Sequence, residues 1–232
     1  MTLTARLSSS GLPYLGSAQV REVDALAAER FGISVDWLME SAGWQVASFC
    51  TGLTAVVCGA GNNAGDGLAA ARHLHRWGRL ASVSCAAAER LRGPAAQELE
   101  ALRRIGVEVS AELDLAGAQM VADAIFGTGI TRPPEGRFAE WIGAINGSGL
   151  PVVAVDLPSG LDADSGVAYA PAVRATTTVT LGLPKAGLTR ADGPRLAGEV
   201  WVADIGVPFE AYAALGIEVP PDLFARSRAF KL

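Results

Sequence analysis

The stretch TAVVCGAGNNAGDG, residues 54–67, decides the fold of this chain. It begins with an unbroken run of apolar and β-branched residues, which is typical of a strand covered on both faces. The glycine-rich segment Gly59–Gly67 follows at once and leads into a helical pattern. Glycines let the backbone turn sharply and approach a ligand closely, and a helix N-terminus presents free N–H groups to an anion. The stretch therefore predicts a buried strand, a loop that fits a phosphate, and a helix.

This loop differs from two familiar phosphate-binding motifs. Ala64 stands where the third glycine of G-x-G-x-x-G belongs, and no Lys-Ser/Thr pair follows as it does in a P-loop. Asn62 and Asn63 can donate to a ligand or accept from it. Asp66, near a helix start, could instead simply cap that helix. Ligand binding is the favoured interpretation, and a tight turn is the alternative.

The alternation of strand and helix continues along the chain. Further strands are expected at residues 80–84, 121–126, 152–156, 176–181 and 199–205, with helices at 18–30, 35–50, 68–77, 94–104 and 138–146. Repeated strand–helix units with continuous apolar strands favour an α/β fold with a mostly parallel sheet. We expect residues 17–207 to form one domain, residues 1–16 a flexible arm, and residues 208–232 a tail that packs on the domain or trails from it.

Composition excludes several classes of partner. The 19 Lys and Arg residues against 24 Asp and Glu residues give a net charge of −5, so the broad basic surface that nucleic acids and anionic membranes select is missing. Three cysteines without CxxC spacing suit a reducing compartment, and no signal peptide or run of about 18 apolar residues occurs. His73 and His75 are too few, and wrongly spaced, for a zinc site. We expect a soluble cytoplasmic protein.

Two aspartates stand at or near strand ends. Asp123 lies inside an apolar run, where a carboxylate is costly unless it is paired, hydrogen-bonded or bound to a cation. Asp156 ends the run at 152–156, at the sheet edge where open α/β sheets bind ligands and a general acid or base meets a substrate. Ser159 follows Asp156, but it lacks the glycines of G-x-S-x-G and a downstream His, so a serine hydrolase is excluded. Lys185 follows a later strand and could reach the same edge.

Taken together, Gly59–Gly67, Asp123–Gly129, Val155–Asp162 and Leu183-Pro184-Lys185 resemble the YjeF N-terminal domain family, specifically its NAD(P)H-hydrate epimerases. The helical segments Gln19–Asp24 and Leu38–Gly43 look like the opening of that family, so the likeness covers residues 17–207. The resemblance implies a Rossmann-like α/β/α sandwich of three layers. It also implies an isomerase of metabolite repair, which interconverts the R and S epimers of hydrated NADH or NADPH.

The resemblance implies roles for particular residues. The substrate site would be lined by three groups of residues. They are Asn62, Asn63, Ala64, Gly65 and Asp66; Gly127, Thr128, Gly129, Ile130, Thr131, Arg132 and Pro133; and Asp156. A potassium ion would be held by Asn63, Asp123 and Ser159, and such all-oxygen ligation suits a hard cation. We assign the proton transfer to Asp156, with Lys185 as a second candidate. The hydroxyl-bearing carbon adjoins the ring nitrogen, so it can invert by loss and return of hydroxide or by ring opening.

Two departures from the family pattern bear on activity. Ala64 replaces the first glycine of the usual Asn-Asn-Gly-Gly-Asp-Gly, where an alanine would be strained if the backbone φ were positive. Ser41 stands where Asn is common. The alternative function is therefore a non-catalytic module that binds a nucleotide-like ligand or a protein. An NAD-dependent oxidoreductase is disfavoured because no acidic residue ends the second strand.

The resemblance also bears on partners. A stereospecific NAD(P)H-hydrate dehydratase would use the product, and we expect it to be a separate chain, since only 25 residues follow residue 207. The apolar faces of the helices at 18–30 and 35–50 could form a homodimer interface, although packing on their own sheet is the commoner use.

Overall fold

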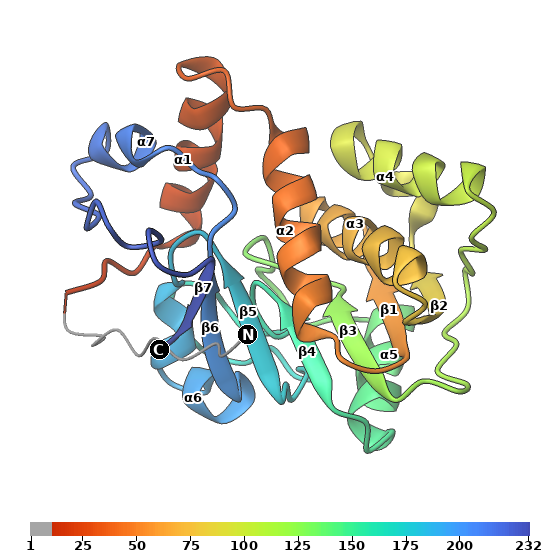
Figure 1. Cartoon of the computed structure of the whole chain (residues 1–232). Coiled ribbons are helices and arrows are strands. Elements are labelled where there is room, and N and C mark those ends of the chain that lie inside the picture. The colour runs from red at the N-terminus through yellow and green to blue at the C-terminus, as the bar shows by residue number, and fades with distance from the viewer. Residues whose placement is uncertain (1–10) are drawn as a thin grey trace.

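The apolar run that opens the deciding stretch forms strand β1 (Thr54–Cys58), and all five of its residues are buried. In the computed structural model, which describes residues 11–232, β1 lies within a seven-stranded sheet of order β2-β1-β3-β4-β5-β6-β7 (Figure 1). Strands β1 to β6 are parallel, and β7 pairs antiparallel with β6. The predicted α/β architecture with a mostly parallel sheet is confirmed.

The elements lie close to their predicted places. The other strands are β2 (Leu80–Cys85), β3 (Met120–Ala124), β4 (Val152–Val155), β5 (Thr177–Leu181), β6 (Glu199–Ala203) and β7 (Ala229–Lys231). The helices are α1 (Ser17–Glu29), α2 (Val35–Phe49), α3 (Asn62–Arg76), α4 (Gly93–Arg104), α5 (Arg137–Gly147), α6 (Gly193–Leu196) and α7 (Phe209–Ala213), with short 3₁₀ turns at Ala88–Arg90 and Ala186–Thr189. Helix α3 begins six residues before its predicted start, and this difference changes the view of the glycine-rich segment.

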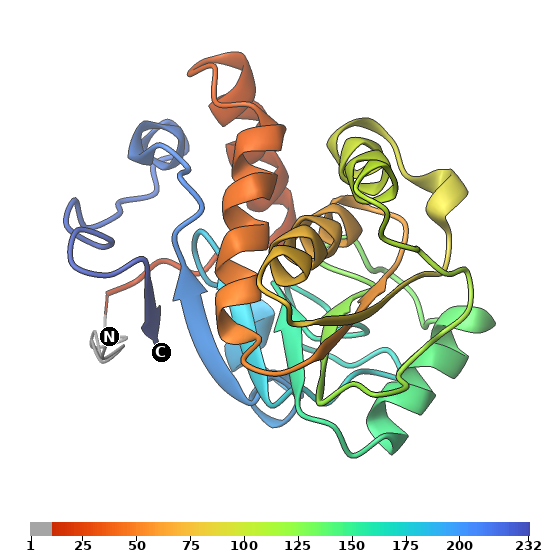
Figure 2. The same ribbon diagram turned by 45° about the vertical axis from the view of Figure 1, so that its right-hand side comes forward.

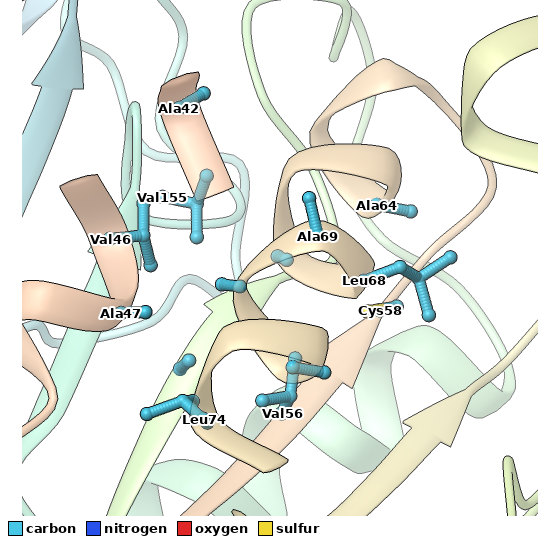
Figure 3. Close-up of a cluster of buried hydrophobic side chains, with 14 of the residues drawn as sticks. Ala42, Val46, Ala47, Val56, Cys58, Ala64, Leu68, Ala69, Leu74 and Val155 are labelled. Atoms are coloured by element: carbon cyan, nitrogen blue, oxygen red, sulfur yellow. The ribbon is translucent and has the colours of Figure 1, made fainter. Parts of the chain in front are cut away.

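Helices cover both faces of the sheet, which gives the three layers expected (Figures 1 and 2). Alternate residues of β1 point to opposite faces of the sheet. Val56 packs in a core cluster with α2 and α3, whereas Val57 packs in another cluster with α5. The close-up in Figure 3 shows Val46 of α2, Leu68 and Leu74 of α3, and Val56 gathered in the first cluster. Helix α4 packs on α3 in the same layer.

Both ends of the described chain pack on this sandwich. The tail predicted as mixed helix and coil contributes α7 and the edge strand β7. Residues 1–10 of the expected flexible arm lie outside the described residues, whereas Leu15 is buried and pairs with Lys185 in an isolated bridge. Apolar residues of α1 and α2, such as Val23 and Leu38, are buried in one cluster with residues of α7. These faces are thus used within the chain.

Candidate active site

A cavity of about 410 Å³ lies at the carboxyl end of the sheet, within the size range of small-molecule sites. Segments that follow β1, β3, β4, β5 and β6 line it, and helices α1 and α7 complete the wall. Its polar lining residues include Arg21, Asp24, Asn62, Asn63, Asp66, Thr128, Asp156, Lys185 and Tyr212. Every strand-end segment singled out in the sequence therefore contributes at least one residue to a single site.

The glycine-rich segment is only partly a loop. Gly61 is the N-cap of α3, so residues from Asn62 onward form the first turns of that helix and their N–H groups lie at the cavity. The glycines serve close packing here. A Cβ on Gly59 would lie 2.0 Å from the carbonyl oxygen of Ile125, and one on Gly67 would lie 2.4 Å from the Cβ of Ala124. Neither has a positive φ, so the sharp turn expected of these glycines is not what they provide.

The concern over Ala64 is resolved by the same helix. Ala64 lies in the first turn of α3 and is fully buried in the core, and its φ is not positive. The strain expected of an alanine there is absent. Ala64 and the buried Gly65 lie outside the cavity lining, while Asn62, Asn63 and Asp66 belong to it. The segment thus meets the cavity with its asparagines and Asp66.

Asp66 does not cap α3. It lies one turn into the helix, the N-cap position has no side-chain hydrogen bond, and Asp66 forms no hydrogen bond or ion pair within residues 11–232. Burial raises the pKa of its carboxyl well above the ordinary value, and the nearby charges of Asp156 and Asp24 raise it further, while Lys185 lowers it. Asp66 is therefore a cavity-lining carboxyl group with a raised pKa.

The loop that follows β3, residues 127–133, lies partly at the cavity and partly at the surface. Gly127, Thr128, Gly129 and Ile130 line the cavity. Thr131, Arg132 and Pro133, which the resemblance also places at the substrate, are exposed and lie outside the lining. Only the first half of this loop therefore lies where it could make the substrate contacts that the resemblance implies.

Asp123 and Ser159 meet beneath the cavity. The Ser159 hydroxyl donates to Asp123 Oδ1 at 2.6 Å, the Ser159 N–H donates to Oδ2 at 2.9 Å, and the Ile125 N–H donates to Oδ1 at 3.2 Å. Both residues are fully buried. Burial raises the pKa of Asp123 to about 6, against the lowering effect of these hydrogen bonds. These bonds are also those expected of a buried aspartate that only joins neighbouring loops.

The residues implied for potassium fit a cation of that kind. Ser159 Oγ also accepts from the Phe126 N–H at 2.8 Å, and the Asn63 amide lies against the next residue, Gly127, so the three implied ligands surround one short segment. The Asn63 side chain has a buried amide nitrogen without a hydrogen-bond partner. In the described part of the chain, no group of three His, Cys, Asp or Glu residues could hold a metal ion. A site here would use one carboxylate with neutral oxygens, which suits a hard monovalent cation.

Asp156 and Lys185 form a buried ion pair at the sheet edge. Lys185 Nζ lies 2.5 Å from Asp156 Oδ1 and donates to the carbonyl oxygen of Leu181 at 2.6 Å, and only 2% of its side chain is exposed. The same Oδ1 accepts from the Leu181 N–H at 3.0 Å and from Thr180 Oγ1 at 3.1 Å. Asp156 Oδ2 has no hydrogen bond within residues 11–232. That oxygen is left for a ligand in the cavity.

The backbone at Asp156 is strained. Its φ is +66°, and the Leu157 N–H donates to the Val155 carbonyl across it at 2.8 Å, as in the rare form of the γ-turn. Strain of this kind costs on the order of 1–3 kcal/mol and concentrates at functional sites. The turn directs the aspartate from the end of β4 into the site, where the sequence placed it.

Sequence reasoning missed the contribution of α1 and α7. Arg21 and Asp24 line the cavity from α1, and Tyr212 lines it from α7. One signal was available for Asp24, which lies four residues after Val20 and three before the buried Ala27, within the apolar stripe of its helix. No comparable pattern marks Tyr212, since its contact with the site depends on how the tail folds back.

The histidines and cysteines lie away from this chemistry. His73 is buried with its Nε2 at 3.0 Å from Glu40 Oε1, and His75 is exposed, so their side chains face different ways as their spacing indicated. All three cysteines are free and buried, and burial raises the pKa of each thiol. Among the described residues, no helix combines the length and apolar character needed to cross a membrane.

Sequence comparison assigns this chain to a known protein family. The family model described as YjeF-related protein N-terminus matches residues 35–187. The chain belongs to this family. The NAD(P)H-hydrate epimerase of Rhodopirellula baltica, which is 35% identical over 211 residues, covers 86% of this chain and is itself covered to 86%. The YjeF-related resemblance stated from the motifs is thereby confirmed.

Two further relatives extend the family comparison. The bifunctional NAD(P)H-hydrate repair enzyme Nnr of Thermofilum pendens is 42% identical over 209 residues, which are 82% of this chain but 40% of that protein. This chain therefore spans well under half of the bifunctional relatives. The crystal structure of the yeast protein ynu0, YNL200c, has a TM-score of 0.77 at 25% identity and covers 95% of this chain. This YjeF-related chain shares its fold.

Proposed function

We propose that this chain is an NAD(P)H-hydrate epimerase, an isomerase that interconverts the R and S epimers of hydrated NADH and NADPH. One observation carries the proposal: Asp156, strained and ion-paired to Lys185, directs a free carboxylate oxygen into a cavity bordered by the start of α3. Relatives that carry this activity in their names match over most of the chain.

The distribution of charge indicates how such a substrate lies. The phosphates are best placed near the N-terminus of α3, where unpaired N–H groups favour anions, and near Arg21. The hydrated nicotinamide ring carries no charge, so it is the part that the carboxyl groups of Asp24, Asp66 and Asp156 can border without repulsion. This orientation explains how an acidic chain binds a dinucleotide without a broad basic surface.

In the proposed mechanism Asp156 Oδ2 moves the proton of the reacting hydroxyl. Lys185 Nζ holds Oδ1 and orients the carboxylate, which makes Lys185 a positioning group. We propose potassium as the cofactor, held by Asn63, Asp123 and Ser159. When bound, it would supply positive charge below the cavity. The three buried, free cysteines support a reducing compartment, the cytoplasm, as the place of action.

The bifunctional relatives support a further proposal about partners. An NAD(P)H-hydrate dehydratase that accepts one epimer is the proposed functional partner, because an epimerase alone removes no hydrate. Homodimer formation through α1 and α2 stays a prediction from the sequence.

The test is conversion of the pure R hydrate to the S form, followed by chromatography with and without potassium. Asp156→Asn should lower the rate by about 10²-fold or more, and the fold should persist because asparagine tolerates the left-handed backbone. Asp164→Asn is the matched control, because Asp164 lies outside the cavity lining, in the segment after β4, where it accepts a hydrogen bond from Ser17 at the start of α1. Full activity in Asp156→Asn would remove the catalytic assignment. Tight binding of the hydrate by wild-type chain without any conversion would favour the non-catalytic module.

A further inference from the structure

Helix α1 presents a half-buried carboxyl group, that of Asp24, to the cavity. Val20, Arg21, Val23 and Asp24 all line the cavity, and Val23 belongs to the apolar cluster between α1 and α7. A carboxyl group within such a stripe is costly unless it is paired or serves a function. Asp24 has no hydrogen bond or ion pair among the residues that the structure describes. Packing of α1 alone does not explain it.

The groups around Asp24 set its protonation. It faces Lys185 and Asp156 from the strand ends, Asp66 from α3 and Tyr212 from α7, while Arg21 lies on its own helix. The ammonium group of Lys185 is already bound to Asp156 and to the carbonyl of Leu181. Burial raises the pKa of Asp24 to about 6, and Asp156 adds to this while Lys185 opposes it. Two carboxyls of one cavity thus differ: Asp156 is ion-paired and Asp24 is not.

Inversion at one carbon needs proton transfer on both faces of the ring. The hydroxyl leaves from one face and returns to the other, whereas Asp156 is fixed by its γ-turn and by three contacts to one oxygen. A second group on a different element meets this need, and Asp24 extends from the helical wall of the same cavity. We propose that Asp24 is a second catalytic acid and base that works with Asp156, an inference that rests on the proposed epimerisation.

Each turnover passes one proton from Asp24 to the departing water and one from the entering water to Asp156, and proton exchange with solvent restores both carboxyl groups. The Asp24 carboxylic acid donates its proton to the hydroxyl, the C–O bond breaks with its electron pair on oxygen, and water leaves. The lone pair of the ring nitrogen meanwhile forms a C=N bond. A water then adds to the opposite face of the same carbon, its proton passes to the Asp156 carboxylate, and the C=N pair returns to nitrogen. In the reverse direction, protonated Asp156 donates and ionised Asp24 accepts.

The experiment compares Asp24→Asn and Asp24→Glu with wild type and with Glu22→Gln, an exposed position on the same helix outside the cavity lining. Conversion of R to S hydrate is measured between pH 5 and 8. Since the reaction from R to S needs the proton on Asp24, the wild-type kcat/KM should fall about tenfold per pH unit above about 6. Asp24→Asn should lose about 10²-fold in kcat, keep its KM, and lose this limb of the profile. Asp24→Glu should recover part of the rate, and Glu22→Gln should match wild type.

A second measurement does not depend on turnover. With ¹³C-labelled aspartate, two carboxyl resonances, those of Asp24 and Asp123, should titrate near pH 6 in wild type. Asp24→Asn should lose one of the two, and its circular dichroism should match wild type. If wild type converts the hydrate while Asp24→Asn keeps its rate and its pH limb, the assignment of Asp24 is overturned and the proposed function stands. If folded wild type converts no hydrate, the proposed function is overturned, and the assignment of Asp24 with it.

Discussion

The buried pair of Lys185 and Asp156 gives a direct test of the site's energetics. Lys185→Met keeps the aliphatic part of the side chain and removes the ammonium that lies 2.5 Å from Asp156 Oδ1. Asp156→Asn keeps an oxygen for the Leu181 N–H and Thr180 Oγ1 while removing the negative charge. Each single substitution leaves one charge of the pair without its partner in a buried setting.

The expected magnitudes follow from that burial. Breaking a buried pair by removing one member costs about 3–5 kcal/mol, whereas removing both charges is far less harmful. We expect each single variant to lose about 3 kcal/mol of unfolding free energy. The double variant should lose no more than either single one, which gives a coupling energy of about 3 kcal/mol.

Urea unfolding of the four proteins at pH 7, followed by fluorescence and circular dichroism, measures this cycle. A single transition with a shared dependence on urea makes the four free energies comparable. Losses that simply add, with a coupling below about 0.5 kcal/mol, would refute the buried pair as the element that orders Asp156. Lys185→Met should also lower epimerisation, because the Asp156 carboxylate then loses the contact that orients it.

The remaining predictions concern the glycine-rich segment. Ala64→Gly, which restores the usual family residue, should lower the unfolding free energy by about 1 kcal/mol without raising the epimerisation rate, because Ala64 is helical and buried; a faster enzyme would contradict this. Gly59→Ala should destabilise by about 3 kcal/mol or more, since its Cβ would meet the backbone oxygen of Ile125 at 2.0 Å. Gly61→Ala is the matched control, with open space around its Cβ. Equal melting temperatures for these two variants would contradict the packing argument.

The parts of the site that follow strands could be predicted from the sequence. Asp123 and Asp156 interrupt or end apolar runs, and parallel strands bring their carboxyl ends to one edge. The start of α3 was missed because Gly65 and Gly67 look like loop residues. Their place in a helix depends on contacts with Met39 and Ala124, which leave no room for a side chain.

Other parts could not be predicted because they depend on long-range packing. Asp24 lies on a helix whose apolar stripe predicts burial, but which element covers that stripe is decided by α7, far along the chain. The tail showed no pattern for β7, whose three residues form a strand because the edge of β6 is open to them. The roles of Thr131, Arg132 and Pro133 rested on resemblance alone. A sequence motif does not show whether its residues are exposed, as these three are.

The wall formed by α1 and α7 links the site to the completion of folding. Asp24 lies on α1 and Tyr212 on α7, which are far apart in the sequence, and Leu15 pairs with the Lys185 segment. Contacts between such distant segments carry a large loop-closure cost and form late in folding. The cavity therefore lacks a complete wall in any partly folded state in which β1 to β5 are paired but α7 is not yet docked. A ligand of this cavity would therefore stabilise only the fully folded chain.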